Sequence, residues 1–470
     1  MTVATSWSAE TEAALQRTHE DLGPASEAFR QYLLADPARQ TYFDYRDARR
    51  PQIVLHFSYP IQSWPLLLSA PKVAAFERIS VGLVRLARSI PERFLDNDAE
   101  RLQAYFRVPE ALAAAVKEPT WLDLDTGCGR CDIVDDGDRL HLLELNMGSN
   151  LGGWQLRYWQ PWVMGNAPFL RFAGQAGIKP KYRDVLYQTL CHAIESMIAR
   201  GLDSRGLNLA FVTKSEKGVP ELTRLIQPLY QRALQQVAPD KNGTIVPTTY
   251  PGLFRLEGDR GLVLGGVPIQ AVFEFTDHPT PPEVFRAYKE GSIVLLNVPL
   301  HALVGNKRCL ALLSEHQDSD RLTAEERSLV SEVIPWTREF VPGGRVTYEG
   351  REHDLEELLR SAREHFVLKG ETGIGGNEVV VGPHADAATW EAAIARARDA
   401  GDWLVQRYVA SRPYLLQDHD GTPRPHDIVW GLYVTGRRYA GAFVRAQVQG
   451  RGDGIINAAR GASEALVFEV

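Results

Sequence analysis

The sequence predicts a protein of mixed α+β and α/β structure that is built from several lobes and begins with a helical region. Three observations lead to this prediction. The chain has 470 residues, which is too long for one simple hydrophobic core. Apolar residues in the first 120 positions recur with helical spacing, whereas strands and helices alternate further along the chain. A hydrophobic content of 44% makes a packed interior feasible.

The N-terminal region, residues 1–120, is expected to be mainly helical. Its apolar residues fall at spacings of three and four, which places them on one stripe of a helix. Pro71 can begin this helix and Pro91 is expected to end it, because proline lacks the amide hydrogen that a helix interior needs. The stripe, whose expected role is packing alone, consists of Phe76, Ile79, Leu83, Leu86 and Ile90.

A β-hairpin is expected next, where the turn sequence that begins at Asp135 separates two apolar runs. Asp132 and Glu144 share a face of this hairpin only if the loop has an odd number of residues. We therefore predict a three-residue loop after Asp135, which would pair Asp132 with Leu142. Gly137 is the expected left-handed residue.

The remaining elements follow from apolar periodicity. A helix is expected from position 185 until Gly201, which ends it. Strands at 207–213, 271–275 and 292–298 alternate with helices, one of them at 222–237, and this rhythm predicts a small parallel sheet. The last hundred residues are strand-rich, with strands expected at 366–369, 379–382, 403–409, 428–434 and 439–445.

Composition excludes several classes of function. A net charge of −7 argues against a nucleic-acid partner, because neutralising phosphates needs a basic face. The longest apolar runs, such as 294–298, are far shorter than the roughly 20 residues that span a bilayer. No secretory leader is recognisable, and four cysteines do not make a disulfide framework. We expect a cytoplasmic protein without a membrane partner.

Cys128 and Cys131 have the spacing of a redox or metal motif. The sequence has no second such pair and no close pair of histidines to complete a tetrahedral site. We therefore interpret the two cysteines as small, partly buried residues beside a strand.

Side chains around the hairpin predict a metal site. Glu144 and Asn146 are two positions apart on a strand, so their oxygens face the same side. With Asp132 they form a hard oxygen site suited to Mg²⁺ that bridges nucleotide phosphates. The alternative is an exposed acidic hairpin edge.

A glycine-rich turn follows the strand that carries Lys369. Glycines let backbone amides close over phosphates, and the lysine supplies positive charge. No Lys-Ser/Thr pair follows these glycines, and the turn opens a strand, so neither a Walker loop nor a Rossmann fingerprint is present. The glycines are Gly373, Gly375 and Gly376. The alternative is an ordinary hairpin.

Further polar residues lie on or beside later strands. The strand that holds Gln406, Tyr408 and Val409 can present backbone groups to an adenine edge, although an ordinary core strand would have the same pattern. Lys307 opens a helix, and a solvated surface lysine is the alternative for it. The final segment contributes Asp427, Arg445 and Asn457.

Together these clusters resemble the ATP-grasp superfamily. In the usual order the Arg-x-Asp…Glu-x-Asn element comes last, whereas here it precedes Lys307 and Lys369. This order is similar to that of the circularly permuted ATP-grasp proteins related to glutathionylspermidine synthase. The Leu-Glu-Leu-Asn segment at 143–146 and the segment at 305–314 are also similar to that group. The resemblance covers roughly residues 120–160 and 205–470.

The resemblance implies a domain organisation and a set of ligands. It implies a helical N-terminal region at 1–120, a relocated metal-binding part of the C-terminal lobe at 121–200, a pre-ATP-grasp α/β lobe at 201–313, a lid lobe at 314–409 and the rest of the C-terminal lobe at 410–470. It implies ATP and Mg²⁺ as cofactors.

It also implies a role for each candidate residue. Lys307, Lys369 and the glycine-rich turn would contact the phosphates of ATP; Gln406, Tyr408 and Val409 would hold the adenine; Asp132, Glu144 and Asn146 would hold Mg²⁺; Arg130, Arg445 and Asn457 would face the γ-phosphate; and the loop 148–153 would flank an acceptor carboxylate. One departure is that Val429 stands where family members often have an arginine two positions after the residue that matches Asp427.

The implied reaction is the ADP-forming ligation of a small-molecule carboxylate, such as an amino acid or a small peptide, to an amine through an acyl phosphate. Arg157 could pair with a second carboxylate of the substrate, although a surface arginine is an equal interpretation. Two other functions stay open: a kinase or phosphotransferase acting on a small molecule, and a nucleotide-binding protein without catalysis.

Overall fold

The structure, a computed structural model, describes residues 7–43, 46, 60–114, 127–214, 216, 219–250, 254–258, 261–276, 278–296, 301–373 and 378–470. Helices and several separate β-sheets make up this part of the chain, so the prediction of a mixed α and β protein is confirmed. No helix among these residues has the length and apolar character needed to cross a membrane.

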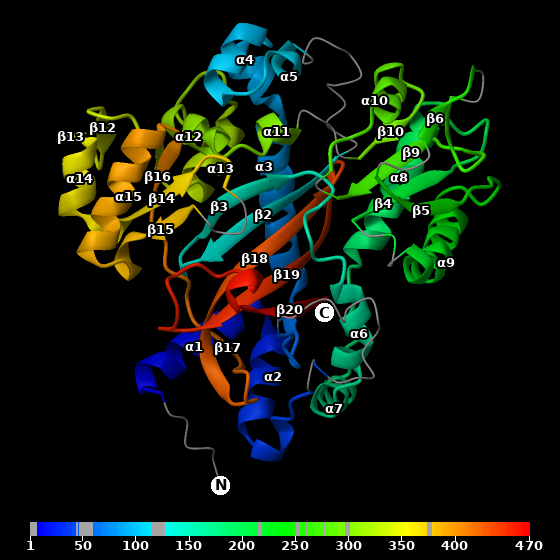
Figure 1. Cartoon of the computed structure of the whole chain (residues 1–470). Helices are drawn as coiled ribbons and strands as arrows, with labels where there is room; N and C mark the ends of the chain where they lie inside the picture. The colour runs from blue at the N-terminus through cyan, green and yellow to red at the C-terminus, as the bar shows by residue number, and fades with distance from the viewer. Residues whose placement is uncertain are drawn as a thin grey trace.

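A seven-stranded sheet lies at the centre of the molecule (Figure 1). It combines three stretches of chain that are far apart in sequence, because the hairpin at 128–147 and the short strand β1 both pair with C-terminal strands. The strand order is β1-β20-β19-β18-β2-β3, with β17 paired to β18. The strands are β1 (Leu66–Leu68), β2 (Cys128–Asp135), β3 (Leu140–Met147), β17 (Tyr414–Gln417), β18 (Pro423–Thr435), β19 (Arg438–Val448) and β20 (Ser463–Glu469).

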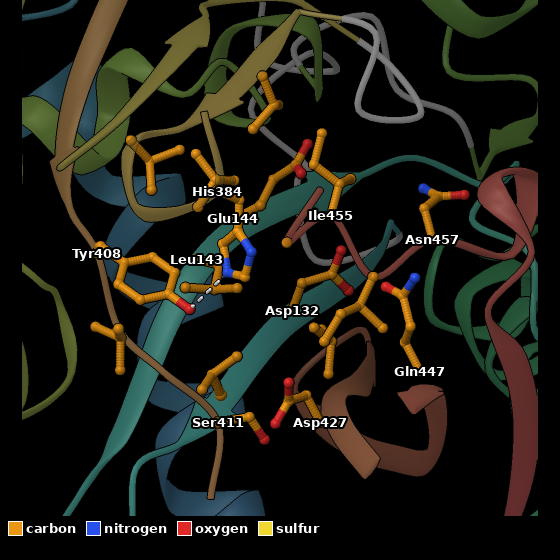
Figure 2. A pocket seen from close by; sticks show the side chains of 18 of the residues that line it. Asp132, Leu143, Glu144, His384, Tyr408, Ser411, Asp427, Gln447, Ile455 and Asn457 are labelled. Carbon is orange, nitrogen blue, oxygen red and sulfur yellow. Dashed lines mark hydrogen bonds between the residues drawn. The ribbon is translucent and has the colours of Figure 1, made fainter. Parts of the chain in front are cut away.

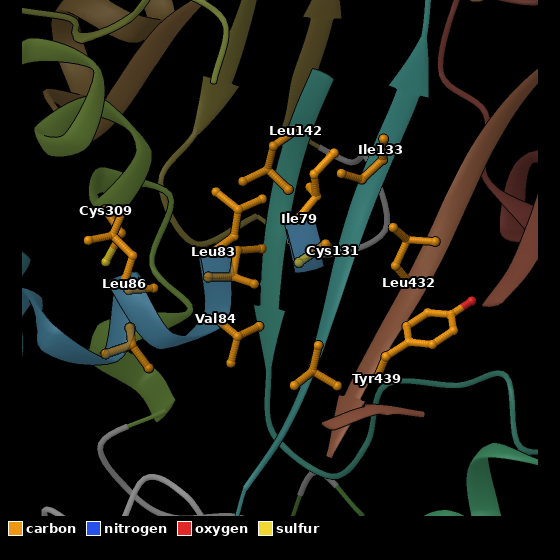
Figure 3. Packing of buried hydrophobic residues seen from close by; sticks show 14 of the residues in the cluster. Ile79, Leu83, Val84, Leu86, Cys131, Ile133, Leu142, Cys309, Leu432 and Tyr439 are labelled. Atoms are coloured by element: carbon orange, nitrogen blue, oxygen red, sulfur yellow. The ribbon is translucent and has the colours of Figure 1, made fainter. Parts of the chain in front are cut away.

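One face of this sheet packs on the long helix α3 (Ala70–Leu95), which runs behind the strands in Figure 1. Figure 3 shows Leu83 and its neighbours on α3 beside Ile133, Leu142 and Leu432 of three adjacent strands. The predicted apolar stripe of α3 is buried throughout. Burying this stripe against a sheet supplies more stabilisation than helix propensity alone.

The predicted end of α3 is wrong. The helix passes through Pro91 and continues to Leu95, where Asp96 takes a left-handed conformation with φ 55°. Pro91 removes one backbone hydrogen bond, but the turn after it buries Phe94 and Leu95 in the same core. Tertiary burial therefore outweighs the local helix-breaking signal.

Other helices surround the central sheet. The described part of the N-terminal region is mainly helical, as predicted, and α6 and α7 follow the hairpin. These helices are α1 (Ala9–Leu22), α2 (Pro24–Leu34), α4 (Ala99–Phe106), α5 (Glu110–Ala114), α6 (Leu156–Met164) and α7 (Ala167–Ala176).

The hairpin β2–β3 has a different loop from the one predicted. Asp135 pairs with Leu140, so four residues form the loop, and Gly137 has the expected positive φ, at 103°. A β-bulge between Ile133 and Asp132 then shifts the register by one residue, and Asp132 pairs with Glu144 instead of Leu142. The two carboxylates still share one face, because the bulge supplies the extra residue that the loop does not.

A parallel four-stranded sheet of order β10-β9-β4-β5 lies to one side of the central sheet (Figure 1). It confirms the predicted small parallel sheet, and the strand predicted at 271–275 has those bounds. Its elements, with a small antiparallel sheet beside it, are β4 (Leu209–Thr213), β5 (Ile245–Thr249), β9 (Ala271–Phe275), β10 (Val294–Leu295), α8 (Val185–Ala199), α9 (Val219–Val237), α10 (Pro282–Lys289), β6 (Phe254–Leu256), β7 (Leu262–Leu264) and β8 (Val267–Pro268).

An antiparallel sheet of order β11-β16-β14-β15, which we call the hairpin sheet, lies on the opposite side (Figure 1). It has its own core, which includes Phe366 and Trp390. The elements of this part are α11 (His301–Val304), α12 (Arg308–Glu315), α13 (Ala324–Val333), β11 (Thr337–Glu339), β12 (Arg345–Tyr348), β13 (Arg351–Asp354), α14 (Leu355–Ser361), β14 (Phe366–Gly370), β15 (Val379–Val381), α15 (Ala387–Ala400) and β16 (Trp403–Arg407). The domain boundaries expected from the sequence stay predictions.

The packing of α3 can be tested by truncation. Leu83→Ala should lower the free energy of unfolding by about 2–5 kcal/mol, because a buried leucine loses its contacts and leaves a cavity. Arg85→Ala, at an exposed position of the same helix, should change it by no more than about 0.5 kcal/mol. Urea denaturation measures both variants, and equal losses would contradict this account of the core.

Candidate active site

A cleft of about 1040 Å³, including its part open to solvent, lies between the hairpin sheet and the central sheet. Figure 2 shows side chains from both sheets around this space, with Asp132 and Glu144 on β2 and β3 and with Tyr408 and His384 opposite them. The cleft therefore brings together residues that are far apart in the sequence, from Asp132 to Asn457. Its predicted lining residues are Asp132, Glu144, Lys369, Gln406, Tyr408, Val409, Arg445 and Asn457.

The acidic end of the cleft is built by strand register. Asp132 pairs with Glu144, and Arg130 pairs with Asn146, so all four side chains project from the same face of the sheet. Arg445 on β19 lies on this face too, because it pairs with Val429 on the neighbouring strand β18. The opposite face is the one buried on α3.

Asp132 is the most heavily bonded carboxylate of the cleft. Arg130 binds it through Nε and Nη2, at 2.8 and 3.1 Å, and Arg445 Nη2 lies 2.9 Å from its Oδ2. The Asn146 amide donates to the same oxygen at 3.1 Å. Burial alone would raise the pKa of Asp132, but the charges and hydrogen bonds of the two arginines outweigh it and lower the pKa. The carboxylate is therefore ionised.

Arg445 has an unused donor at the cleft wall. Its Nε is buried and has no hydrogen-bond partner within the described ranges of the chain. A buried N–H without an acceptor is costly, so a small turn of this guanidinium toward an anionic oxygen in the cleft would be favourable.

Lys307 links Glu144 to the glycine-rich hairpin. Its Nζ lies 3.2 Å from Glu144 Oε1 and donates to the Gly373 carbonyl oxygen at 2.8 Å. The Lys307 side chain is only 6% exposed. This burial favours the prediction that Lys307 belongs to the site over the alternative that it is a solvated surface lysine. Gly375 and Gly376 lie outside the described residues.

Lys369 points toward the hairpin β2–β3. Its Nζ donates to the Leu143 carbonyl oxygen at 3.1 Å and to Gln406 Oε1 at 2.6 Å. Leu143 is the extra residue of the bulge, so the irregularity that aligns the carboxylates also leaves a carbonyl for this lysine. Burial lowers the pKa of Lys369 to about 8; the charge of Glu144 opposes this shift and that of Lys307 adds to it.

An apolar slot continues from Lys369 along the cleft. Val367, Val379 and Val381 line it from the hairpin sheet, and Val134, Leu143, Val429, Ile455 and Ile456 line it from the other side. Gln406 is held in place by Lys369 and by Thr337, to whose Oγ1 it donates at 3.1 Å. The next segment, with Tyr408 and Val409, forms the end wall. A flat apolar ring edged by a few polar groups fits this slot.

Asn457 and Asp427 occupy the outer part of the cleft (Figure 2). The Asn457 side chain accepts a hydrogen bond from the Ala459 amide at 2.9 Å, which fixes the turn that carries it. Burial raises the pKa of Asp427 to about 6, and Gln449 donates to it at 3.2 Å. Val429, where an arginine was expected by resemblance, contributes apolar surface.

The loop 148–153 crosses the same face beyond Arg130. Arg130 Nη1 donates to the Leu151 carbonyl, and Tyr433 donates to the Gly152 carbonyl at 2.8 Å. Gly153 has φ 81°, and a Cβ there would lie 1.9 Å from the Tyr433 hydroxyl, so only glycine fits. Arg157 forms an ion pair with Asp184, the N-cap of α8, within the protein.

Cys128 and Cys131 lie on strand β2 itself, not beside a strand as expected. Cys128 and Cys131 are both buried, and burial raises the pKa of both thiols. In the described part of the chain, no group of three or more His, Cys, Asp or Glu side chains is arranged to hold a metal ion. A candidate magnesium site therefore depends on two carboxylates, Asp132 and Glu144, with the amide of Asn146.

Several residues of the cleft were not predicted from the sequence. Gln447 had a usable signal, because it follows Arg445 by two positions on one strand and pairs with Asp427. His384 had none: it follows β15 in a short turn, and its Nε2 lies 3.4 Å from the Tyr408 hydroxyl. Ser411 also lines the cleft.

Comparison with known proteins gives a fold-level likeness. No protein-family model matches the chain, and no curated protein matches its sequence. The solved structure of a glutathione synthetase-like effector from Globodera pallida, in its apo form, aligns over 88% of this chain and 90% of that chain with 12% identity and a TM-score of 0.55. A protein from Methylobacillus flagellatus KT, assigned by name as a gamma-glutamylcysteine synthetase, aligns over 83% of this chain and 89% of that chain with 14% identity and a TM-score of 0.38. The first likeness shows a shared fold.

The lowered pKa of Lys369 predicts a reactive amine. The side chain should be protonated below about pH 8 and neutral above it, whereas an unperturbed lysine changes near 10.5. Labelling with limiting acetic anhydride, read by mass spectrometry, should give a midpoint for Lys369 near 8. Glu144→Gln removes a charge that raises this pKa and should move the midpoint lower. A wild-type midpoint near 10.5 would contradict this description of the cleft.

Proposed function

We propose that this chain is an ATP-dependent carboxylate–amine ligase that releases ADP. The observation that supports this best is the charge of the cleft. Four cationic side chains, Arg130, Arg445, Lys307 and Lys369, surround two carboxylates, which leaves an excess of two positive charges. The excess positive charge lies at one end of an apolar slot. A purine nucleotide fits this arrangement, because its base is flat and apolar and its phosphates are negatively charged.

In this proposal the slot holds the adenine between the hairpin sheet and β18. Gln406 orients Lys369, and the segment with Tyr408 and Val409 offers backbone groups to the base edge. Lys369 and Lys307 neutralise the phosphates. The carbonyl of Gly373 holds Lys307 toward the glycine-rich hairpin, whose amides would close over the same phosphates.

The donor set fits Mg²⁺. Hard oxygen ligands on one sheet face, from Asp132, Glu144 and Asn146, are the kind that this ion prefers. When bound, the ion would neutralise phosphate charge and hold the triphosphate in one orientation. The ion pair between Lys307 and Glu144 would open, because the lysine would turn from the carboxylate to a phosphate.

The first chemical step needs little covalent help from the protein. A substrate carboxylate oxygen bonds to the γ-phosphorus, and the bond to the ADP oxygen breaks, which gives an acyl phosphate and ADP. Arg130 and the free Nε of Arg445 would stabilise the charge that spreads over the transferring group. Asn457 would complete this end of the cleft.

In the second step an amine nitrogen bonds to the acyl carbon, phosphate leaves, and the amine loses a proton. Water has to be kept from the acyl phosphate during this time. The turn after β15 and the segment 454–457 meet above the cleft, where a Cβ on Gly454 would lie 2.5 Å from the His384 ring. This contact would limit access of water from that side.

The fold likeness to the effector from Globodera pallida agrees with this class of reaction, since that protein is named as glutathione synthetase-like. The chain order supports a permuted ATP-grasp arrangement, because the hairpin at 128–147 precedes the hairpin sheet in sequence yet pairs with β18, which follows it. We propose the domain boundaries expected from the sequence on the same basis.

A screen for ADP release tests the proposed function. The purified protein should release ADP from MgATP only when a carboxylic acid substrate and an amine are both present, with amino acids and small peptides as the first acids to test. ADP release with one acceptor alone, together with a stable phosphorylated product, would identify a phosphotransferase instead. Absence of nucleotide binding would refute the nucleotide site itself.

Glu144→Gln tests the metal assignment. Turnover that depends on Mg²⁺ should fall at least about 100-fold, the scale on which one preorganised electrostatic contact acts. Folding should change less than turnover, because Glu144 is partly exposed and Lys307 keeps its hydrogen bond to the Gly373 carbonyl. Asp138→Asn, at the exposed turn of the same hairpin, is the matched control and should retain activity. Full activity of Glu144→Gln would refute the assignment.

A further inference from the structure

Arg308, the residue after Lys307, joins three other segments in the interior. Its side chain is buried, and its Nε donates to Glu371 Oε2 at 2.6 Å. Its Nη1 donates to the Tyr105 carbonyl oxygen at 2.5 Å and lies 3.0 Å from Glu339 Oε2. The guanidinium therefore connects helix α12 to α4, to β11 and to the base of the glycine-rich hairpin.

Glu371 occupies a central place in that hairpin. It lies two residues after Lys369 and two before Gly373. Its backbone carbonyl accepts from the Lys307 amide at 3.3 Å, and its amide donates to the Asp402 carbonyl at 2.9 Å. Glu371 is thus bonded to Arg308 by its side chain and to Lys307 by its backbone.

The two lysines of the cleft, Lys307 and Lys369, carry like charges and need a connection that holds their segments together. Both ammonium groups lie near Glu144, and the charge of Lys307 adds to burial in lowering the pKa of Lys369. Like charges in a partly buried site repel one another more strongly than in water. This repulsion favours separation of the two ammonium groups, so a connection between their segments would keep both beside Glu144.

We propose that Arg308 and Glu371 are positioning residues for nucleotide binding: their buried ion pair fixes the base of the glycine-rich hairpin on α12 and so sets the spacing of Lys307 and Lys369. Neither side chain belongs to the described wall of the cleft, so both act through the lysines. This inference rests on the proposed function, because it concerns the phosphates of the same nucleotide.

A purely structural ion pair is the alternative, and loss of stability cannot separate the two. Removing Glu371 alone leaves the buried guanidinium of Arg308 with only the partly exposed Glu339 as its counter-charge, which destabilises the protein whatever the pair does. Removing both charges avoids the buried charge and leaves only Glu339, whose side chain is 26% exposed, without its cation. Arg30 and Glu27 in helix α2 provide a matched control: they are also buried and lie 2.7 Å apart, and the described cleft wall does not include them.

The experiment compares Glu371→Gln, the double variant R308M/E371M and the control R30M with the wild type. Calorimetry measures the Kd for MgATP and for adenosine, and thermal unfolding measures Tm. We expect both test variants to bind MgATP about tenfold more weakly, as for loss of one charge-assisted contact, with unchanged affinity for adenosine. The double variant should recover part of the Tm that Glu371→Gln loses, without recovering MgATP affinity. R30M should lower Tm and leave both affinities unchanged.

Three results would overturn the inference. Wild-type MgATP affinity in R308M/E371M would show that the pair serves stability alone. A parallel fall in the affinities for MgATP and adenosine would show a general distortion of the cleft. A wild-type protein that binds neither ligand would remove the proposed function together with this inference, whereas the first two results leave the proposed function standing.

Discussion

The cleft depends on the interactions that the carboxylate of Asp132 makes with its neighbours. This carboxylate holds two guanidinium groups, from β2 and β19, and the amide of Asn146 on β3, so three strands converge on one buried anion. Removing the carboxylate, or both guanidinium groups, would leave the opposite charge buried without a partner. Such a change is among the most destabilising that a protein can undergo. The same bonds aim the arginines along one face of the sheet. The stability of the central sheet and the proposed chemistry therefore both require the ion pairs of Asp132 with the two arginines.

The order of the strands along the chain explains why residues from distant segments line one cleft. The strands β2 and β3 come early in the sequence, the parallel sheet and the hairpin sheet follow, and the strands β18 to β20 return to complete the central sheet. The hairpin sheet consequently borders a cleft whose other wall comes from both ends of this order. Its lysine meets a carbonyl of β3 that a bulge has left out of the strand ladder.

Much of the candidate site was predictable because strand alternation is local. Arg130 and Asp132 share one face, as do Glu144 and Asn146, for any regular strand. The register between the two strands was not predictable: a four-residue loop with a bulge gives the same alignment as the three-residue loop expected, and the sequence does not distinguish them. Pro91 failed as a helix end for a related reason, since burial of the following turn outweighed its local effect. The ion pair of Arg308 with Glu371 gave no signal at all, because 63 residues separate its partners.

The sequence by itself determined which chemical groups were available, which of them share a strand face, and which helix stripe would be buried. These properties depend on neighbours within a few residues, where backbone geometry leaves few choices. Only the tertiary structure decided that Lys307 meets Glu144, that Lys369 meets Leu143, and that burial lowers the pKa of that lysine. Such pairings depend on how whole sheets pack against one another, and the desolvation that shifts a pKa exists only after that packing has excluded water.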